Sequence, residues 1–154
     1  HANQIEVAKY LIEQGANVNA RDAIYDSPYL YAGARGLQEI LALTLAHGAD
    51  LNSINRYGGT ALIPAAERGH VATVKTLIDA GVDVNHVNRL GWTALIEAII
   101  LGDGSQKYAD IVTLLIDGGA DVNLADGSGR TPLTLAKDKG YTNIINILQQ
   151  AGAK

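Results

Sequence analysis

Cysteine is absent from this chain of 154 residues, and proline occurs only three times. The absence of cysteine excludes a disulfide framework, a zinc site built from thiolates and a cysteine nucleophile. It does not identify the compartment, because a cysteine-free chain is compatible with either redox environment. The protein is therefore expected to be either cytoplasmic or exported, and any targeting signal would precede His1.

The sequence also has no long hydrophobic run and no excess of positive charge. Its most apolar stretch, Thr93 to Leu101, contains Glu97 and is far shorter than the roughly 18 apolar residues of a membrane span. Its formal net charge of −4 is the opposite of the clustered Lys and Arg excess that nucleic-acid binding requires. With 47% hydrophobic and 18% charged residues, the chain is too apolar to remain disordered. We expect a folded protein with neither a membrane span nor a nucleic-acid partner.

Glycine, by contrast, is abundant, and the spacing of its 17 residues reveals an internal repeat. Five glycines are separated by 33, 33, 38 and 33 residues: Gly15, Gly48, Gly81, Gly119 and Gly152. The first four open the related segments Gly-Ala-Asn-Val-Asn, Gly-Ala-Asp-Leu-Asn, Gly-Val-Asp-Val-Asn and Gly-Ala-Asp-Val-Asn. A second landmark keeps the same phase: Ser-Pro-Tyr at 27–29, Thr-Ala-Leu at 60–62 and 93–95, and Thr-Pro-Leu at 131–133.

The residues of each unit predict two short helices and a turn. The Ser or Thr of the second landmark is a good N-cap, and a proline at the next position is compatible with the first turn of a helix. This first helix is expected to end at a glycine in the left-handed conformation: Gly36, Gly69, Gly102 or Gly140. A second helix, with apolar residues three and four apart, then ends at the periodic glycine. The segment that follows carries a turn in which positive φ is expected at Gly58, Gly91 and Gly129.

Two helices and a turn in about 33 residues, with both motifs in fixed phase, resemble the ankyrin-repeat family over the whole chain. The resemblance implies an all-α repeat solenoid in which helix pairs stack side by side, turns project as β-hairpin fingers and the first helices line a concave groove. The Gly-Asp-Gly insertion is similar to that of small bacterial members. We divide this single domain into five units: a partial N-terminal repeat (1–21), two repeats (22–54 and 55–87), a repeat with an insertion (88–125) and a C-terminal capping repeat (126–154).

The two ends of the array differ from its interior. One position of the second helix reads, along the array, Ile12, Leu45, Ile78, Ile116 and then Gln149. In the first helix Lys137 likewise replaces small or apolar residues, as is typical of a cap that faces water. At the other end the first helix is missing, so Val7, Leu11 and Ile12 are expected to lack part of their cover. We expect the native chain to extend upstream by at least about a dozen residues, the missing part of a repeat; the alternative is a half-repeat shielded by a neighbour in an oligomer.

Two segments depart from the repeat pattern. Tyr25 stands where the other units have the turn glycine, and a bulky residue is disfavoured at positive φ, so we expect a different turn in this finger. The insertion at 103–108 is expected to lengthen the loop between two helices, at the end remote from the fingers. Drift in the length of a surface loop explains it better than a second contact site.

No arrangement of residues predicts catalysis. The four histidines lack the spacing of helical metal ligands, and each is assigned a structural role: His1, His47, His70 and His86. We predict no catalytic residue, no metal and no cofactor. A small-molecule enzyme would need a ligand bound near Glu67, Glu97 and Asp138, and this is the least favoured of the hypotheses.

Charges and aromatic residues are distributed unevenly between the groove side and the rest of the chain. The fingers and first helices hold eight basic and six acidic residues, whereas the remainder holds four basic and ten acidic residues. Five of the eight aromatic residues also lie on the groove side. Tyr, Trp and Arg dominate the binding energy of many protein interfaces. The candidate partner site therefore consists of Tyr25, Tyr31, Arg35, Arg56, Tyr57, Arg68, Arg89, Leu90, Trp92 and Arg130.

The sequence thus predicts a non-catalytic, monomeric scaffold that binds another protein. In this hypothesis the Arg56/Tyr57 and Arg89/Trp92 fingers, one unit apart, grip an acidic protein segment. The opposing explanation is that Tyr29 packs inside its unit and that the few charges are sorted by chance. A second hypothesis is that the chain is the recognition domain of a longer effector or enzyme whose catalytic part lies upstream, since a fold does not by itself define a function.

Overall fold

The computed structural model describes the backbone of residues 2–154 and the side chains of residues 5–154. This part of the chain contains nine α-helices and no β-strand. In order they are α1 (Ala2–Glu13), α2 (Pro28–Arg35), α3 (Gln38–Ala46), α4 (Leu62–Glu67), α5 (Val71–Asp79), α6 (Ala94–Leu101), α7 (Gln106–Asp117), α8 (Pro132–Lys139) and α9 (Thr142–Gln150).

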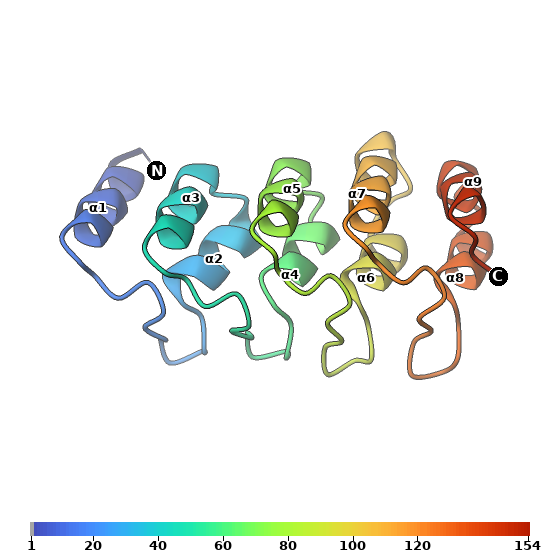
Figure 1. Ribbon diagram of the computed structural model, residues 1–154, viewed down its shortest axis with the longest axis horizontal. Helices are drawn as coiled ribbons and strands as arrows, with labels where there is room; N and C mark the ends of the chain where they lie inside the picture. The colour runs from blue at the N-terminus through green and yellow to red at the C-terminus, as the bar shows by residue number, and fades with distance from the viewer. Residues whose placement is uncertain (1) are drawn as a thin grey trace.

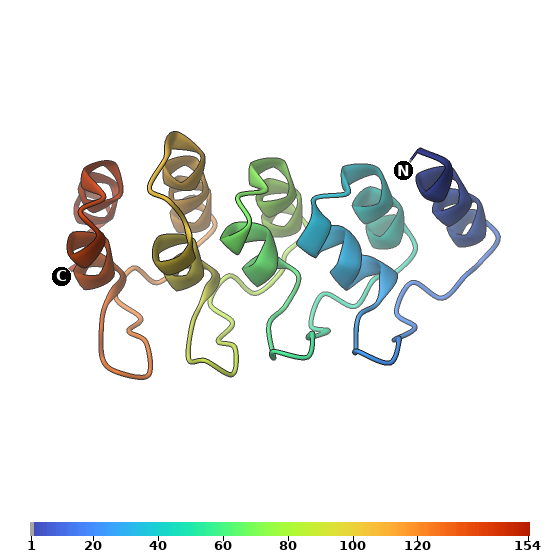
Figure 2. The ribbon, with the colours of Figure 1, turned by 180° about the vertical axis from the view of Figure 1, so that it is seen from behind.

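The helices form two layers along an elongated stack (Figure 1; Figure 2 shows the opposite side). In one layer α1, α3, α5, α7 and α9 pack each against the next, and in the other α2, α4, α6 and α8 do so. Each helix of the second layer also packs against the helix that follows it in the chain. The segments that join each helix of the α1 layer to the next helix of the α2 layer are here called fingers: residues 14–27, 47–61, 80–93 and 118–131. They all project from the same side of the stack (Figure 1). The predicted all-α repeat solenoid is therefore confirmed.

A continuous core lies between the two layers because successive units contribute equivalent side chains. Four such residues, one from each helix of the α2 layer, are no more than 5% exposed: Tyr29, Leu62, Leu95 and Leu133. In the other layer the equivalent position is fully buried in four helices, at Thr44, Leu77, Leu115 and Leu148. Tyr29 is thus a core residue and contributes no surface to a partner, as the opposing explanation of the aromatic distribution held.

The ends of the stack expose side chains of different character. Val7 and Leu11 on α1 are 53% and 52% exposed, as expected for a helix without full cover. The expectation for Ile12 was wrong: it is only 4% exposed, because α1 packs against α3 and Ile12 joins the core. At the other end Lys137 and Gln149 are exposed at positions that are apolar in the interior units.

Three of the four predicted N-caps form. The hydroxyls of Ser27, Thr93 and Thr131 accept hydrogen bonds from the backbone N–H three residues later. The prediction for Thr60 was wrong, and Pro64 is the cause. In the other units the residue at the position of Pro64 donates its N–H to the carbonyl of the cap residue, but proline has no N–H. The Thr60 carbonyl instead accepts the Ile63 N–H, and the Thr60 hydroxyl finds no partner in the described part of the chain.

The predicted left-handed glycines between paired helices occur at Gly36, Gly69 and Gly140, but not at Gly102. Gly102 has φ −72°, and Gly104 takes the positive φ of 72° instead. The insertion does not simply lengthen a loop, as expected, because α7 begins early at Gln106 and has 12 residues against nine in α3, α5 and α9. Tyr108 lies on this extra turn, 7% exposed, and its hydroxyl donates to the Glu67 carbonyl at 2.7 Å.

Each finger is closed by one Asp or Asn side chain rather than by strand pairing, so the expected β-hairpins are tight turns. Asn55 shows the pattern: its Oδ1 accepts from the N–H groups of Tyr57 and Gly59, and its own N–H donates to the Gly59 carbonyl. Equivalent bonds surround Asp22, Asn88 and Asp126. The expectation of a different turn at Tyr25 was wrong, because the bonds to Asp22 hold Tyr25 at φ 65°.

Tyr25 is the only non-glycine residue with positive φ among those described. The left-handed conformation costs an L-residue about 1 kcal/mol or more. We expect Tyr25→Gly to raise the free energy of unfolding, because glycine adopts this conformation without strain. The gain should not exceed about 1 kcal/mol, because glycine loses more backbone entropy on folding and this offsets part of it. Gly129→Ala, the reverse change in an equivalent finger with open space around the added methyl, should lower it by a similar amount in urea denaturation. Unchanged stability in both variants would contradict the strain.

The last asparagine of two of the repeated five-residue segments, Asn19 and Asn85, bonds to the equivalent segment of the next unit. Asn19 donates to the Gly48 carbonyl and accepts the Asp50 N–H, at 2.9 and 2.8 Å. Asn85 makes the same two bonds two interfaces further along, with Gly119 and Asp121. These bonds fix the fingers relative to one another and so position the side chains between them.

Candidate functional site

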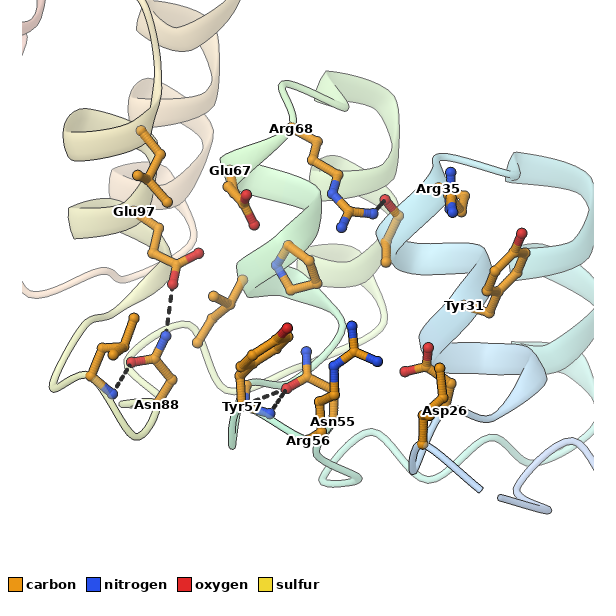
Figure 3. Close-up of a pocket in the computed structure, with 17 residues that line it drawn as sticks. Asp26, Tyr31, Arg35, Asn55, Arg56, Tyr57, Glu67, Arg68, Asn88 and Glu97 are labelled. Carbon is orange, nitrogen blue, oxygen red and sulfur yellow. Dashed lines mark hydrogen bonds between the residues drawn. The ribbon is translucent and has the colours of Figure 1, made fainter. Parts of the chain in front are cut away.

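A hollow of about 440 Å³ opens between the fingers of the second, third and fourth units and the helices α2, α4 and α6 (Figure 3). Its lining combines charged and aromatic side chains with apolar residues such as Ile63, Pro64 and Leu101. Pro64 and Glu97 occupy equivalent positions on α4 and α6, so neighbouring units present different chemistry to the same space.

Six of the ten residues proposed from the sequence line this hollow: Tyr31, Arg35, Arg56, Tyr57, Arg68 and Leu90. They come from α2, α4 and two fingers, which are separated in the chain and brought together by stacking. The other four proposed residues, Tyr25, Arg89, Trp92 and Arg130, lie outside it.

One side of the hollow is basic and aromatic. The Arg56 guanidinium lies 4.9 Å from the centre of the Tyr57 ring, and that of Arg35 lies 5.4 Å from the Tyr31 ring. Arg68 donates to the Ala34 carbonyl at 2.8 Å. No ion pair engages these three arginines within the described residues. Their positive charges are therefore available to a carboxylate of another molecule.

The opposite side of the hollow is acidic and centres on Glu97. This residue is only 5% exposed, and its Oε1 accepts a hydrogen bond of 2.7 Å from the Asn88 side chain. Burial, together with the nearby charge of Glu67, raises the pKa of Glu97 to about 7, although the bond from Asn88 opposes the shift. Glu97 is thus close to half-protonated at neutral pH and sits where a cationic group would stabilise its charge.

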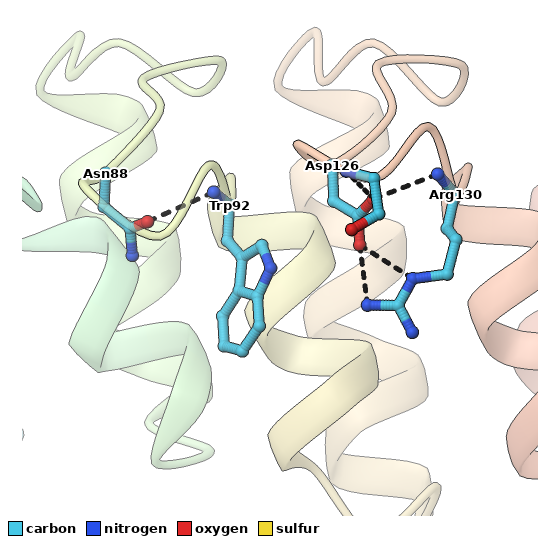
Figure 4. A network of polar contacts seen from close by, with 5 residues as sticks. Asn88, Trp92, Asp126 and Arg130 are labelled. Carbon is cyan, nitrogen blue, oxygen red and sulfur yellow. Dashed lines mark hydrogen bonds and ion pairs between the residues drawn. The ribbon is translucent and has the colours of Figure 1, made fainter.

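The four residues outside the hollow mostly hold the fingers in place. Arg89 donates to the Arg56 carbonyl at 2.6 Å, and its N–H donates to the Tyr57 carbonyl. Arg130 forms an ion pair of 2.8 Å with the buried Asp126 of its own finger (Figure 4). The backbone hydrogen bond from Arg130, with its side-chain bond, holds the pKa of Asp126 below its usual range. Trp92 is half-buried against the core.

Two other hollows flank this site. A smaller one of about 280 Å³ lies between fingers and is lined by Tyr25, Arg56 and Arg89, together with Arg21. An apolar one of about 490 Å³ lies between α1 and the α2–α3 pair, where Ile5, Leu11 and Ile40 are among its lining residues. Tyr31 and Arg35 lie between this apolar hollow and the charged one and line both.

Glu97, Glu67 and Asn88 were not among the residues proposed for partner binding. A signal for Glu97 was present, because it is the only charged residue in the most apolar stretch of the sequence. Asn88 carried no such signal, since Asp or Asn recurs at its position in every finger and its bond to Glu97 depends on folding.

The described residues contain no cluster of three or more His, Cys, Asp or Glu side chains placed to hold a metal ion. Among the helices described, none combines the length and the apolar composition of a membrane span.

Comparison with family models gives matches to ankyrin repeats. A model described as "Ankyrin repeats (3 copies)" matches residues 29–126 and 91–154, and one described as "Ankyrin repeat" matches residues 1–23. Together these matches cover residues 1–23 and 29–154.

Solved structures and sequence relatives agree with the family models. A crystal structure of an ankyrin repeat domain from Acinetobacter baumannii AYE is 66% identical, with a TM-score of 0.97, over 99% of this chain and 78% of that one. The ankyrin repeat protein EF0377 is 55% identical, with a TM-score of 0.92, over 97% of this chain and 76% of that one. The protein YahD of Escherichia coli (strain K12) is 47% identical over 57 residues, 37% of this chain. The chain covers less than a third of the length of the curated relatives it matches.

Proposed function

The chain belongs to the ankyrin-repeat family, a general protein-interaction fold, and from this premise we propose that it binds a partner protein in the hollow lined by α2, α4, α6 and the fingers of the second, third and fourth units. The proposed role is that of a non-catalytic scaffold. The observation that carries the proposal is the set of arginine and aromatic side chains that the stacking of units gathers there.

The composition of this surface supports protein binding. Exposed Tyr31 and Tyr57, 48% and 58% accessible, offer rigid contact area beside charged groups. Arg and Tyr are enriched among residues that dominate binding energy at protein interfaces. Arg56 and Arg35 already stack on these rings, so a partner need not order them completely on binding.

The partner segment is proposed to carry acidic residues opposite the arginines. A guanidinium matches a carboxylate through two parallel hydrogen bonds, and Arg35, Arg56 and Arg68 offer three such groups within one hollow. The finger of Arg89 and Trp92 is proposed to contribute less, because both residues lie outside the hollow, where Arg89 donates to the Arg56 carbonyl and Trp92 packs against the core.

We expect the double variant Arg56→Ala with Tyr57→Ala to weaken binding of the partner by about tenfold or more, since it removes a stacked cation and ring from the hollow. The partner is first captured with the full chain, identified and purified, and its affinity for each variant is then measured by calorimetry. The matched control, Lys75→Ala with Tyr10→Ala, removes one cation and one exposed ring from the opposite layer. Equal losses in both double variants, or none in the first, would rule out this hollow as the binding surface.

A further inference from the structure

The charged groups of the hollow are separated into two sides. Glu67, Glu97 and Asn88 lie toward the unit of α6, whereas Arg35 and Arg56 lie toward α2, with Arg68 between (Figure 3). One acidic residue, Asp26, lies on the side of the arginines, near Arg56. Among the described residues, no ion pair connects the acidic side of the hollow to the basic side. A surface of this kind favours a ligand that is itself bipolar, because each charge then meets its complement.

Glu97 is a buried carboxylate that forms no ion pair with any of the described residues. One carboxylate oxygen accepts from Asn88, and the other has no hydrogen-bond partner among the described residues and points into the hollow (Figure 3). The residue is 5% exposed, so water can compensate its charge only through the hollow. A buried carboxylate without a paired cation is costly, and pairing it with a cation offsets much of that cost.

We propose that the hollow receives a lysine or arginine side chain of the partner segment, with its cationic end between Glu67 and Glu97. The inference rests on the proposed function and specifies its ligand as a bipolar segment. The cation enters the acidic side, and an acidic residue nearby in the segment meets the arginines. Leu101 and Pro64 line the apolar part of the hollow, where the methylene stem of a long cationic side chain packs without losing hydrogen bonds.

Binding of the cation is expected to depend on pH. Only ionised Glu97 attracts it strongly, and the pKa of about 7 makes this form a minority at pH 6 and a large majority at pH 8. The neighbouring charged groups that line the hollow are Glu67 at the end of α4, Arg68 directly after it, Arg35 on α2, and Asp26 and Arg56 on fingers. No residue of α7 or α8 lines it. The Glu97→Gln variant tests whether this pH dependence comes from Glu97.

The test is an NMR titration of the isotopically labelled chain with N-acetyl-argininamide, and with N-acetyl-citrullinamide as an uncharged probe of nearly the same shape. The arginine probe should produce saturable shifts at the amides of Glu67, Asn88 and Glu97, and the citrulline probe should not. The affinity of the chain for the arginine probe should rise by up to about tenfold from pH 6 to pH 8. Equal shifts from both probes, or no saturable shift from either, would overturn the proposal.

Variants separate this site from a general surface effect. Glu97→Gln should weaken the arginine probe by about tenfold and remove its pH dependence, because one full charge is lost. Glu67→Gln, at a more exposed position, should weaken it several-fold and keeps the test valid if the first variant folds poorly. Glu13→Gln on α1 is the matched control and should change nothing. Because no partner protein is used, an unchanged affinity in Glu97→Gln overturns the cation site alone, whereas loss of the partner-binding result overturns the proposed function.

Discussion

Gly102→Ala is expected to lower the free energy of unfolding by about 3 kcal/mol, the largest effect anticipated for a single added methyl group. A Cβ at this position would overlap the Ala98 carbonyl oxygen and would lie 2.6 Å from Cδ1 of Tyr108. The first contact is with backbone of α6 and the second with a ring held by the bond between its hydroxyl and the Glu67 carbonyl, so neither neighbour can move freely. The strain is therefore steric, because φ −72° is open to any residue.

Gly127→Ala is the matched control for this variant. Gly127 also has an ordinary φ, and no atom lies within 4 Å of its added Cβ. Alanine there should leave stability unchanged or raise it slightly, because it reduces the entropy of the unfolded chain. Urea denaturation of both variants measures the difference in midpoint at constant slope. If both variants unfold at the wild-type midpoint, Gly102 is not held as the structure indicates.

Gly102 also shows which structural features the repeat spacing can predict and which it cannot. The period of 33 residues placed every helix pair and every finger correctly, because each unit is specified by its own caps, turns and apolar residues. The same logic assigned Gly102 a left-handed φ, by analogy with Gly36 and Gly69, and failed. Because of the insertion, the chain turns at Gly104 and α7 begins early, at Gln106. The pattern of the regular units contains no information about the backbone conformation of an inserted segment.

The predictions for Tyr25 and Thr60 were wrong for a related reason. In both cases a neighbouring residue of the same unit outweighed the conformational preference of the residue itself. Four hydrogen bonds within the finger, two of them to the Asp22 carboxylate, outweigh the left-handed strain at Tyr25. At Thr60 the sequence shows a good cap residue. It does not show directly that Pro64 lacks the N–H that the cap carbonyl accepts in the other units, so that the carbonyl takes the Ile63 N–H instead. Both outcomes could be predicted only by counting every donor and acceptor of the turn.

The candidate site was predicted in part because stacking is regular. Residues one unit apart on equivalent fingers were expected to be neighbours, and Arg56 does contact Arg89. What sequence could not show is which arginines remain unpaired. Arg130 and Arg89 are engaged within and between fingers, whereas Arg35 and Arg56 stack only on aromatic rings. That distinction depends on side-chain geometry within about 3 Å, beyond the reach of spacing arguments.

The stability of the protein is expected to fall as pH rises from about 4.5 to 7, in the part that depends on Glu97. Its pKa is raised from 4.5 to about 7 in the folded state, first by burial and then by Glu67. Between these values the unfolded state loses the proton while the folded state keeps it, so the folded state binds more protons and stability declines with pH. Integrated over the interval, the loss is at most about 3 kcal/mol and is complete above pH 7.

Glu97→Gln isolates this contribution, because the amide keeps the shape of the side chain and cannot ionise. Asp103 and Asp126, whose pKa values are lowered, act in the opposite direction, so the wild-type curve alone is a sum of effects. The difference between variant and wild type in urea denaturation should be small at pH 4.5 and should favour the variant by up to about 3 kcal/mol at pH 8. Glu13→Gln, on exposed α1, should follow the wild type at every pH. Parallel curves for Glu97→Gln and wild type would mean that Glu97 is solvated like an ordinary carboxylate, and a cation in the hollow would then have no buried charge to neutralise.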